Sequence, residues 1–237
     1  MRLIRLMPKR FLALFLSFLS PVCAPVIHAQ DTPTVTRTGR FLAHFDLAVS
    51  GTALFTKSVS GTVNQSVLGA PYSLSQSVST SAGALVTLRG QKSAFKGLEF
   101  NFGYGRASQT YTCCNNSPTT GALQGPFLPQ ATINEFTLGY VARPERTFFG
   151  FKPYLSVGAG STEFKPTKNG GQGLQPQARL TYYYSVGGEN YLVGDTLGVR
   201  FGLRQLFYKA PDFGQNYLTI NKQTFTVEPQ VGLYLHF

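Results

Sequence analysis

The chain has 237 residues, a formal charge of +11, and 13% charged against 14% aromatic residues. A soluble domain averages about 25% charged residues, so part of this surface is not expected to face water. After the first ten residues the Lys and Arg side chains are scattered, which argues against a nucleic-acid-binding patch and predicts no nucleic-acid partner.

The amino-terminal segment has the pattern of a secretory signal. MRLIRLMPKR carries four basic residues and no acid, and the short apolar run FLALFLSFLS follows it. With a small residue at Ala29 this is typical of a cleaved signal peptide, because a membrane-spanning helix needs about 20 apolar residues. Cys23 suggests a lipoprotein, but Val22 before it is not small. We expect a signal peptide at 1–29, cleaved near Ala29, and a short periplasmic leader at 30–43.

Beyond the leader, apolar and polar residues alternate with a period of two. LEFNFGYG at 98–105 is the clearest case, and such a period over about ten residues indicates a strand. The stretch 80–90 is ambiguous because Leu85 falls among its polar set. The pattern predicts eight strands, at 44–56, 78–90, 97–111, 131–143, 152–164, 177–189, 195–208 and 223–237.

The connections between these strands alternate in length. Long ones at 57–77, 112–130, 165–176 and 209–222 alternate with short ones at 91–96, 144–151 and 190–194. Past the signal no apolar run is long enough for a membrane helix, and a closed barrel is the other structure that spans a bilayer. Long loops outside and short periplasmic turns are typical of outer-membrane barrels. We therefore expect an all-β fold over 44–237: an eight-stranded antiparallel up-and-down transmembrane β-barrel. The connection 57–77 is equally consistent with a solvated extension of the strands.

Side-chain bulk predicts which face lines the lumen. An eight-stranded barrel has an interior just wide enough to be filled by side chains. The Gly, Ser and Thr set fits inside, whereas the Phe, Leu, Val and Tyr set needs the exterior, and an exterior so apolar belongs in lipid. A soluble barrel with the faces exchanged is the disfavoured alternative. Aromatic residues near strand ends are expected to form an interfacial girdle: Phe95, Tyr111, Phe148, Phe149, Phe151, Phe164, Tyr191 and Phe207.

With these features the chain resembles small bacterial outer-membrane β-barrels of the OmpA/OmpX type. The signal peptide, the eight strands, PYLSVGAG in the fifth and the terminal VGLYLHF carry the resemblance. It implies an outer-membrane location among lipid and lipopolysaccharide, and a last strand read by the barrel-assembly machinery. The assembly signal maps onto alternate residues that end in phenylalanine: Val231, Leu233, Leu235 and Phe237. We expect no large periplasmic domain after the barrel.

Strand parity directs a set of charges into the lumen: Asp46, Glu99, Glu135, Arg143, Glu189, Arg200, Arg204 and Glu228. Hairpin register brings Arg204 close to Glu228, and Glu99 near Arg89 and Arg143. In one interpretation the charges pair, fill the lumen and fix the register, because unpaired buried charges are costly. In the other they line a narrow ion path or form a gate.

Few residues suit catalysis or metal binding. The mature chain has His44 and His236, which with Asp46 share inward parity at the periplasmic ends of strands. A polar rim explains this group better than a catalytic or metal site, since two imidazoles and one carboxylate are a weak ligand set. No serine elbow, phosphate loop or zinc spacing appears. We expect no enzyme activity, no cofactor and no metal.

Cys113 and Cys114 are adjacent in the long connection 112–130. In an oxidising compartment they bond to each other, pair with another chain, or remain as free thiols or soft-metal ligands; we expect the bond between them. Three functions then stay open. The favoured one is a structural or surface-interaction role through the extracellular loops, with an unknown partner. A narrow pore for small solutes is the alternative, and an outer-leaflet lipid-modifying enzyme is disfavoured by the histidine placement.

Overall fold

The computed structural model describes residues 44–63, 71–93, 95–113 and 126–237. The signal peptide expected at 1–29, its cleavage near Ala29 and the leader at 30–43 lie outside these residues. No helix in the described part of the chain is long and apolar enough to cross a membrane.

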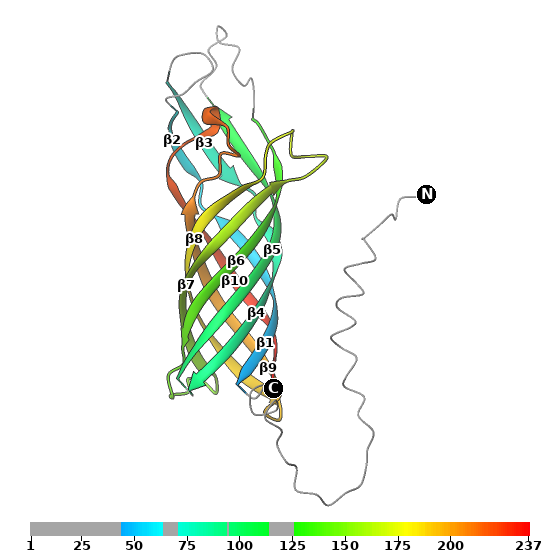
Figure 1. Ribbon diagram of the computed structural model, residues 1–237, viewed down its shortest axis with the longest axis vertical. Helices are drawn as coiled ribbons and strands as arrows, with labels where there is room; N and C mark the ends of the chain where they lie inside the picture. Colours follow the sequence, from blue (N-terminus) through cyan, green and yellow to red (C-terminus); the bar gives the residue numbers. More distant parts are fainter. Residues whose placement is uncertain (1–43, 64–70, 94, 114–125) are drawn as a thin grey trace, which may run out of the picture. The chain divides into compact units, whose positions relative to one another are not determined.

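Eight long strands close into an antiparallel barrel (Figure 1). Each pairs with the next along the chain, and β1 pairs with β10 to complete the ring. The strands are β1 Phe45–Thr56, β4 Ser81–Ser93, β5 Lys96–Cys113, β6 Gln130–Ala142, β7 Lys152–Pro166, β8 Gln177–Val193, β9 Leu197–Lys209 and β10 Gln223–His236. The predicted fold class is therefore confirmed.

A hairpin extends one end of the barrel, where the sequence predicted a long loop or a continuation of the strands. β2 (Val59–Val63) pairs with β3 (Tyr72–Val78), and β3 pairs with the far end of β5, from Val78 opposite Gln109 to Leu74 opposite Cys113. Both short strands keep a period of two with a weaker contrast, because Gly61 interrupts the apolar face of β2 and Gln76 interrupts that of β3.

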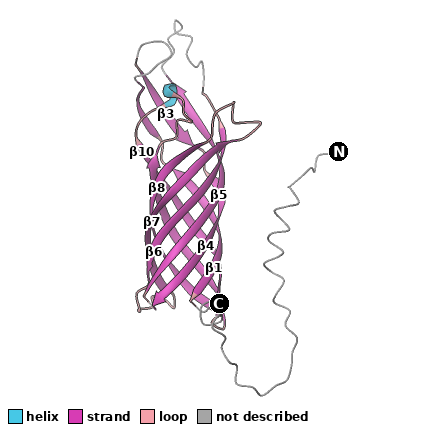
Figure 2. Cartoon of the chain, viewed as in Figure 1, coloured by secondary structure: helices cyan, strands magenta, loops and turns pink. Residues whose placement is uncertain are grey.

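The two ends of the barrel differ. At the end that we name the short-turn end, brief turns join β4 to β5, β6 to β7 and β8 to β9. The opposite, long-loop end carries the β2–β3 hairpin and the connection from β9 to β10, which holds η1 (Asn216–Leu218), a single 3-10 turn. Figure 2 shows that the remaining regular structure of the described chain is strand.

The two faces of the strands divide as bulk predicts. Large apolar side chains are exposed around the outside, among them Leu98, Leu138, Val157, Tyr182 and Leu203. The ambiguous Leu85 points inward and is 3% exposed. The prediction of an aromatic girdle is wrong for Tyr111 and Phe164, which are buried. Both side chains face inward and join an apolar cluster at the long-loop end.

Candidate functional site: the closed lumen

The structure places all eight sequence-predicted charges on the inside of the barrel. Seven are buried, and Arg143 lies near the short-turn end with its side chain 13% exposed. Those within strands point inward because successive side chains of a strand alternate between its two faces, and these charges share the face of the small, inward residues. The eight fall into two groups along the lumen.

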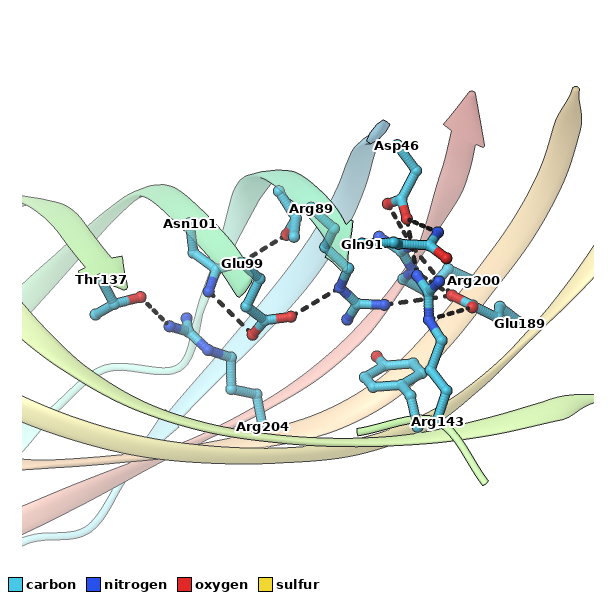
Figure 3. A network of polar contacts seen from close by, with 12 residues as sticks. Asp46, Arg89, Gln91, Glu99, Asn101, Thr137, Arg143, Glu189, Arg200 and Arg204 are labelled. Atoms are coloured by element: carbon cyan, nitrogen blue, oxygen red, sulfur yellow. Dashed lines mark hydrogen bonds and ion pairs between the residues drawn. The ribbon is translucent and has the colours of Figure 1, made fainter. Parts of the chain in front are cut away.

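The first group lies near the short-turn end and balances three acids with three arginines (Figure 3). Arg89 of β4, which was not among the eight, belongs to this group. It forms ion pairs with Glu99 at 2.8 Å and with Glu189 at 3.3 Å. Arg200 bridges Asp46 at 2.7 Å and Glu189 at 3.1 Å.

Arg143 completes this group from the end of the barrel. It donates a hydrogen bond to Asp46 at 2.7 Å and forms an ion pair with Glu189 at 3.0 Å. Hairpin register had placed Glu99 near both Arg89 and Arg143. Glu99 pairs with Arg89, whereas Arg143 pairs with Asp46 and Glu189. The six charges come from five strands (β1, β4, β5, β8 and β9) and from the position just after β6, so the network ties opposite walls of the barrel together.

The second group surrounds Arg204 of β9, deeper in the lumen. Its guanidinium donates to Glu135 at 2.8 Å, to Glu228 at 3.2 Å and to the hydroxyl of Thr137 at 2.8 Å. A second Arg204 nitrogen also pairs with Glu135. One arginine therefore serves two carboxylates. A cavity of about 20 Å³ adjoins both acids, which is room for one water molecule.

Tyrosine rings line both groups of charges. These tyrosines were not among the predicted lumen residues, because only charged residues were considered for the lumen. Tyr154 lies under Arg89, with the guanidinium carbon 4.3 Å from the ring centre, and Tyr183 lies under Arg204 at the same distance. The Tyr183 hydroxyl donates to Glu99 at 2.7 Å and so connects the two groups. The sequence could have predicted the inward position of Tyr183, because it lies two residues from Thr181 and two from Ser185, both of which face inward.

Facing glycines make space for these rings. A Cβ atom at Gly139 would meet the hydroxyl of Tyr183 and lie 2.7 Å from the carbonyl oxygen of Val157. A Cβ at Gly202 would meet the hydroxyl of Tyr154. Small residues therefore allow large ones to lie flat across a narrow lumen.

A folded cap closes the lumen at the long-loop end. The connection from Ala210 to Lys222, expected to be an exposed loop, turns inward and buries Phe213 and Leu218 completely. These side chains join the apolar cluster formed by the tops of the strands. Tyr111 donates to the carbonyl oxygen of Pro211 at 2.8 Å, which fixes the cap to β5.

Asp212 holds the cap in place. Its carboxylate accepts from Gln177 at 2.6 Å and from Thr219 at 3.0 Å, and it pairs with Arg179 at 2.9 Å. The side-chain amide oxygen of Gln177 accepts a hydrogen bond from the backbone N–H of Phe213 at 3.0 Å. Burial alone would raise the pKa of Asp212, but the Gln177 hydrogen bond and the Arg179 charge hold that pKa below its ordinary value.

The remaining candidate residues are placed as follows. Asp46 stands opposite His236 in register, but its carboxylate is engaged by arginines. Within the described ranges no group of three or more His, Cys, Asp or Glu is arranged to hold a metal ion. Cys113, at the end of β5, is disulfide-bonded; its predicted partner Cys114 lies outside the described residues. The four residues of the expected assembly signal are exposed on the outer face of β10 and just after it: Val231, Leu233, Leu235 and Phe237.

Comparison with solved structures gives three similar proteins. Outer membrane protein OprG from Pseudomonas aeruginosa has 14% identity and a TM-score of 0.51, over 81% of this chain and 95% of that one. Neisserial surface protein A has 14% identity and a TM-score of 0.46, over 81% and 97%. Outer membrane protein AlkL, determined in DMPC bilayers, has 15% identity and a TM-score of 0.36, over 79% and 87%.

Neither the family models nor the curated proteins compared with the sequence give a match. The likeness to OprG shows the fold: the chain has a small eight-stranded antiparallel β-barrel like that of this outer membrane protein. The resemblance predicted from the sequence is confirmed at that level.

Proposed function

We propose that the protein is an integral barrel of the bacterial outer membrane, with its short-turn end in the periplasm and its long-loop end outside the cell. The continuous apolar exterior of the eight strands supports this placement, as does the fold shared with OprG. In this setting outer-membrane lipid and lipopolysaccharide surround the barrel. The barrel-assembly machinery reads the last strand through Val231, Leu233, Leu235 and Phe237.

We further propose that the barrel is closed and that its role is structural or surface interaction. The observation that carries this proposal is the lumen itself: Arg200 and Arg204 are among the largest fully buried side chains, and each is held by two acids. Beyond them, Phe213 and Leu218 fill the far mouth. A path for hydrated ions would have to break both barriers.

The long-loop end is suited to recognition because it is rigidly supported. Tyr72 of β3 donates to the carbonyl oxygen of Tyr217 in η1, and Gln76 donates to the carbonyl oxygen of Pro211 at 3.3 Å. These bonds join the β2–β3 hairpin to the cap. Loops carry recognition when a scaffold holds them, so this end is the proposed contact surface for a partner outside the cell.

Single-channel recording tests the closed lumen. The mature chain is refolded in detergent, checked for a heat-modifiable band on a gel, and inserted into a planar bilayer. We expect no discrete conductance steps. Steps in the wild-type protein that change size in Arg204→Ala would support the narrow pore instead and remove the proposal of a closed barrel.

A further inference from the structure

Three exposed lysines stand at the long-loop end where β9, β10 and β1 are neighbours. Lys57 follows β1, Lys209 ends β9 and Lys222 immediately precedes β10, and all three are exposed. Lys209 stands opposite Gln223, and the backbone N–H of Lys57 donates to the carbonyl oxygen of Phe225 at 2.9 Å. Lys57 and Lys209 therefore lie at similar height on either side of β10. Lys222 stands just before β10, and its Cε would lie 3.6 Å from a Cβ atom at Gly61 of β2. We name the three residues the lysine triad.

A row of aromatic rings runs directly below the triad. Tyr184 of β8, Phe207 of β9 and Phe225 of β10 are adjacent, with ring centres 6.0 and 6.3 Å apart. The Lys57 ammonium lies 5.3 Å from the centre of the Phe225 ring. The row is continuous with the apolar exterior of the same strands, so cations meet apolar surface along one line.

No acid of β1, β8, β9 or β10 neutralises the triad, and β9 contains no acid. The three acids of β1, β8 and β10 are Asp46, Glu189 and Glu228, and all are buried in the lumen beside arginines. Within the described part of the chain, none of the three lysines forms an ion pair. The side of the barrel formed by β9, β10 and β1 therefore presents uncompensated positive charge at its long-loop end.

We propose that the lysine triad binds the phosphate groups of an anionic glycolipid in the outer leaflet, with its acyl chains along the ring row. This inference rests on the proposed outer-membrane placement. Ammonium groups bind phosphate as compact charges, and aromatic rings are favoured where lipid meets water. A soluble phosphate would use the triad but not the rings, so the joined surface selects a ligand that has both parts.

The test compares binding of bisphosphorylated lipid A in mixed detergent micelles to the refolded barrel and to two charge-matched variants. One variant removes the triad (Lys57→Gln, Lys209→Gln and Lys222→Gln). The control removes three exposed cations elsewhere at the same end (Arg106→Gln, Lys165→Gln and Lys168→Gln). We expect the triad variant to weaken binding by at least roughly 10-fold and the control by less than about 2-fold. Binding of a phosphate-free lipid of the same chain length should be equal in all three proteins.

Equal losses in both variants would mean general charge attraction and would overturn the site, as would no loss in the triad variant. Inorganic pyrophosphate is the competitor that separates the sources of phosphate. If pyrophosphate displaced the lipid at a concentration equal to that of the lipid, the acyl chains would add nothing to binding, and the proposed role of the ring row would be overturned. The assay does not depend on a closed lumen, so conductance steps in the bilayer experiment would leave its outcome unchanged.

Discussion

At the scale of single residues, the arginines hold the lumen because each is shared. Arg89 links Glu99 to Glu189, and Arg200 links Asp46 to Glu189. Tyrosine rings cover the faces of the guanidinium groups, which adds cation–π attraction in a space with little water. Loss of one arginine therefore takes a donor away from two buried carboxylates at once.

Arg200→Met should destabilise the barrel strongly. The substitution retains bulk but removes the donors to Asp46 and Glu189, and breaking a buried pair from one side costs about 3–5 kcal/mol. Urea unfolding of the barrel in lipid vesicles measures this loss. The matched control is Arg106→Met, an exposed arginine bonded to Gln130, which should stay within about 0.5 kcal/mol of wild type.

A double variant checks the cause. In Arg200→Met with Asp46→Asn, the carboxylate charge that lost one of its two arginines is also removed. The losses of unfolding free energy in the two single variants should then add up to more than the loss in the double variant, by roughly 0.5–3 kcal/mol. Strict additivity would show that Arg200 acts through its bulk and not through its acids.

Gly139→Ala should cost about 1–3 kcal/mol through overpacking. The new methyl group would meet the Tyr183 hydroxyl and the backbone at Val157, which cannot both move. Gly51→Ala is the control, because its Cβ would meet the carbonyl oxygen of Val231 at an ordinary 4.0 Å. The same vesicle unfolding assay compares the two, and equal stability would contradict the close packing of Tyr183.

The sequence predicts part of this residue-level picture. Parity alone directs the eight charges inward, and hairpin register places Arg204 beside Glu228. Contacts between strands that are not neighbours, such as Arg89 with Glu189 or Arg204 with Glu135, depend on the tilt and stagger of the closed barrel. A period of two carries no information on stagger across the lumen, so these pairs could not be foreseen.

At the scale of elements, strands with strong contrast were predictable and the ends of the barrel were not. The eight long strands follow the alternation of bulky and small residues. β2 (VSGTV) and β3 (YSLSQSV) are rich in Ser, Gly, Thr and Gln, so their sequence resembles that of a polar loop when the neighbouring β5 is not known. The cap has no regular period, yet Phe213, Leu218 and Ile220 are buried, because a turn at Phe213 and the 3-10 turn η1 fold the segment back onto the apolar cluster.

The cap should loosen in acid through Asp212. Because the folded pKa of Asp212 is lowered, its ionised form stabilises the cap at pH values above the ordinary range near 4. That stability is lost as the pH falls through the lowered folded value. Hydrogen exchange at the backbone amides of Phe213 and Leu218 should therefore show falling protection below about pH 4, after correction for intrinsic exchange rates.

Asp212→Asn separates this effect from general acid unfolding. The amide has no charge for Arg179, so cap protection should already be low at pH 7 and change little with pH. If the variant loses protection in acid as steeply as the wild type does, another group controls the cap. Exchange at the centre of β9 serves as the internal reference for the barrel wall.

At the scale of the whole molecule, the chain is inverted relative to a soluble domain. Its charges and small residues fill the interior, while large apolar side chains face outward on every long strand. Leu138, in the middle of β6 and beside Phe100 and Ala159 in register, is 59% exposed. Such an arrangement is stable where lipid replaces water around the middle of the barrel.

A single charge on this exterior tests that environment. Leu138→Arg should cost about 2–4 kcal/mol in lipid vesicles, because it places an arginine near the bilayer midplane. Ala82→Arg, on the outer face of β4 close to the long-loop end, should cost about 0–1 kcal/mol because its charge reaches the interface. Urea unfolding of both variants in vesicles gives the two losses. If both positions lose the same small amount, the exterior does not lie in lipid, and the outer-membrane placement fails together with the glycolipid site that depends on it.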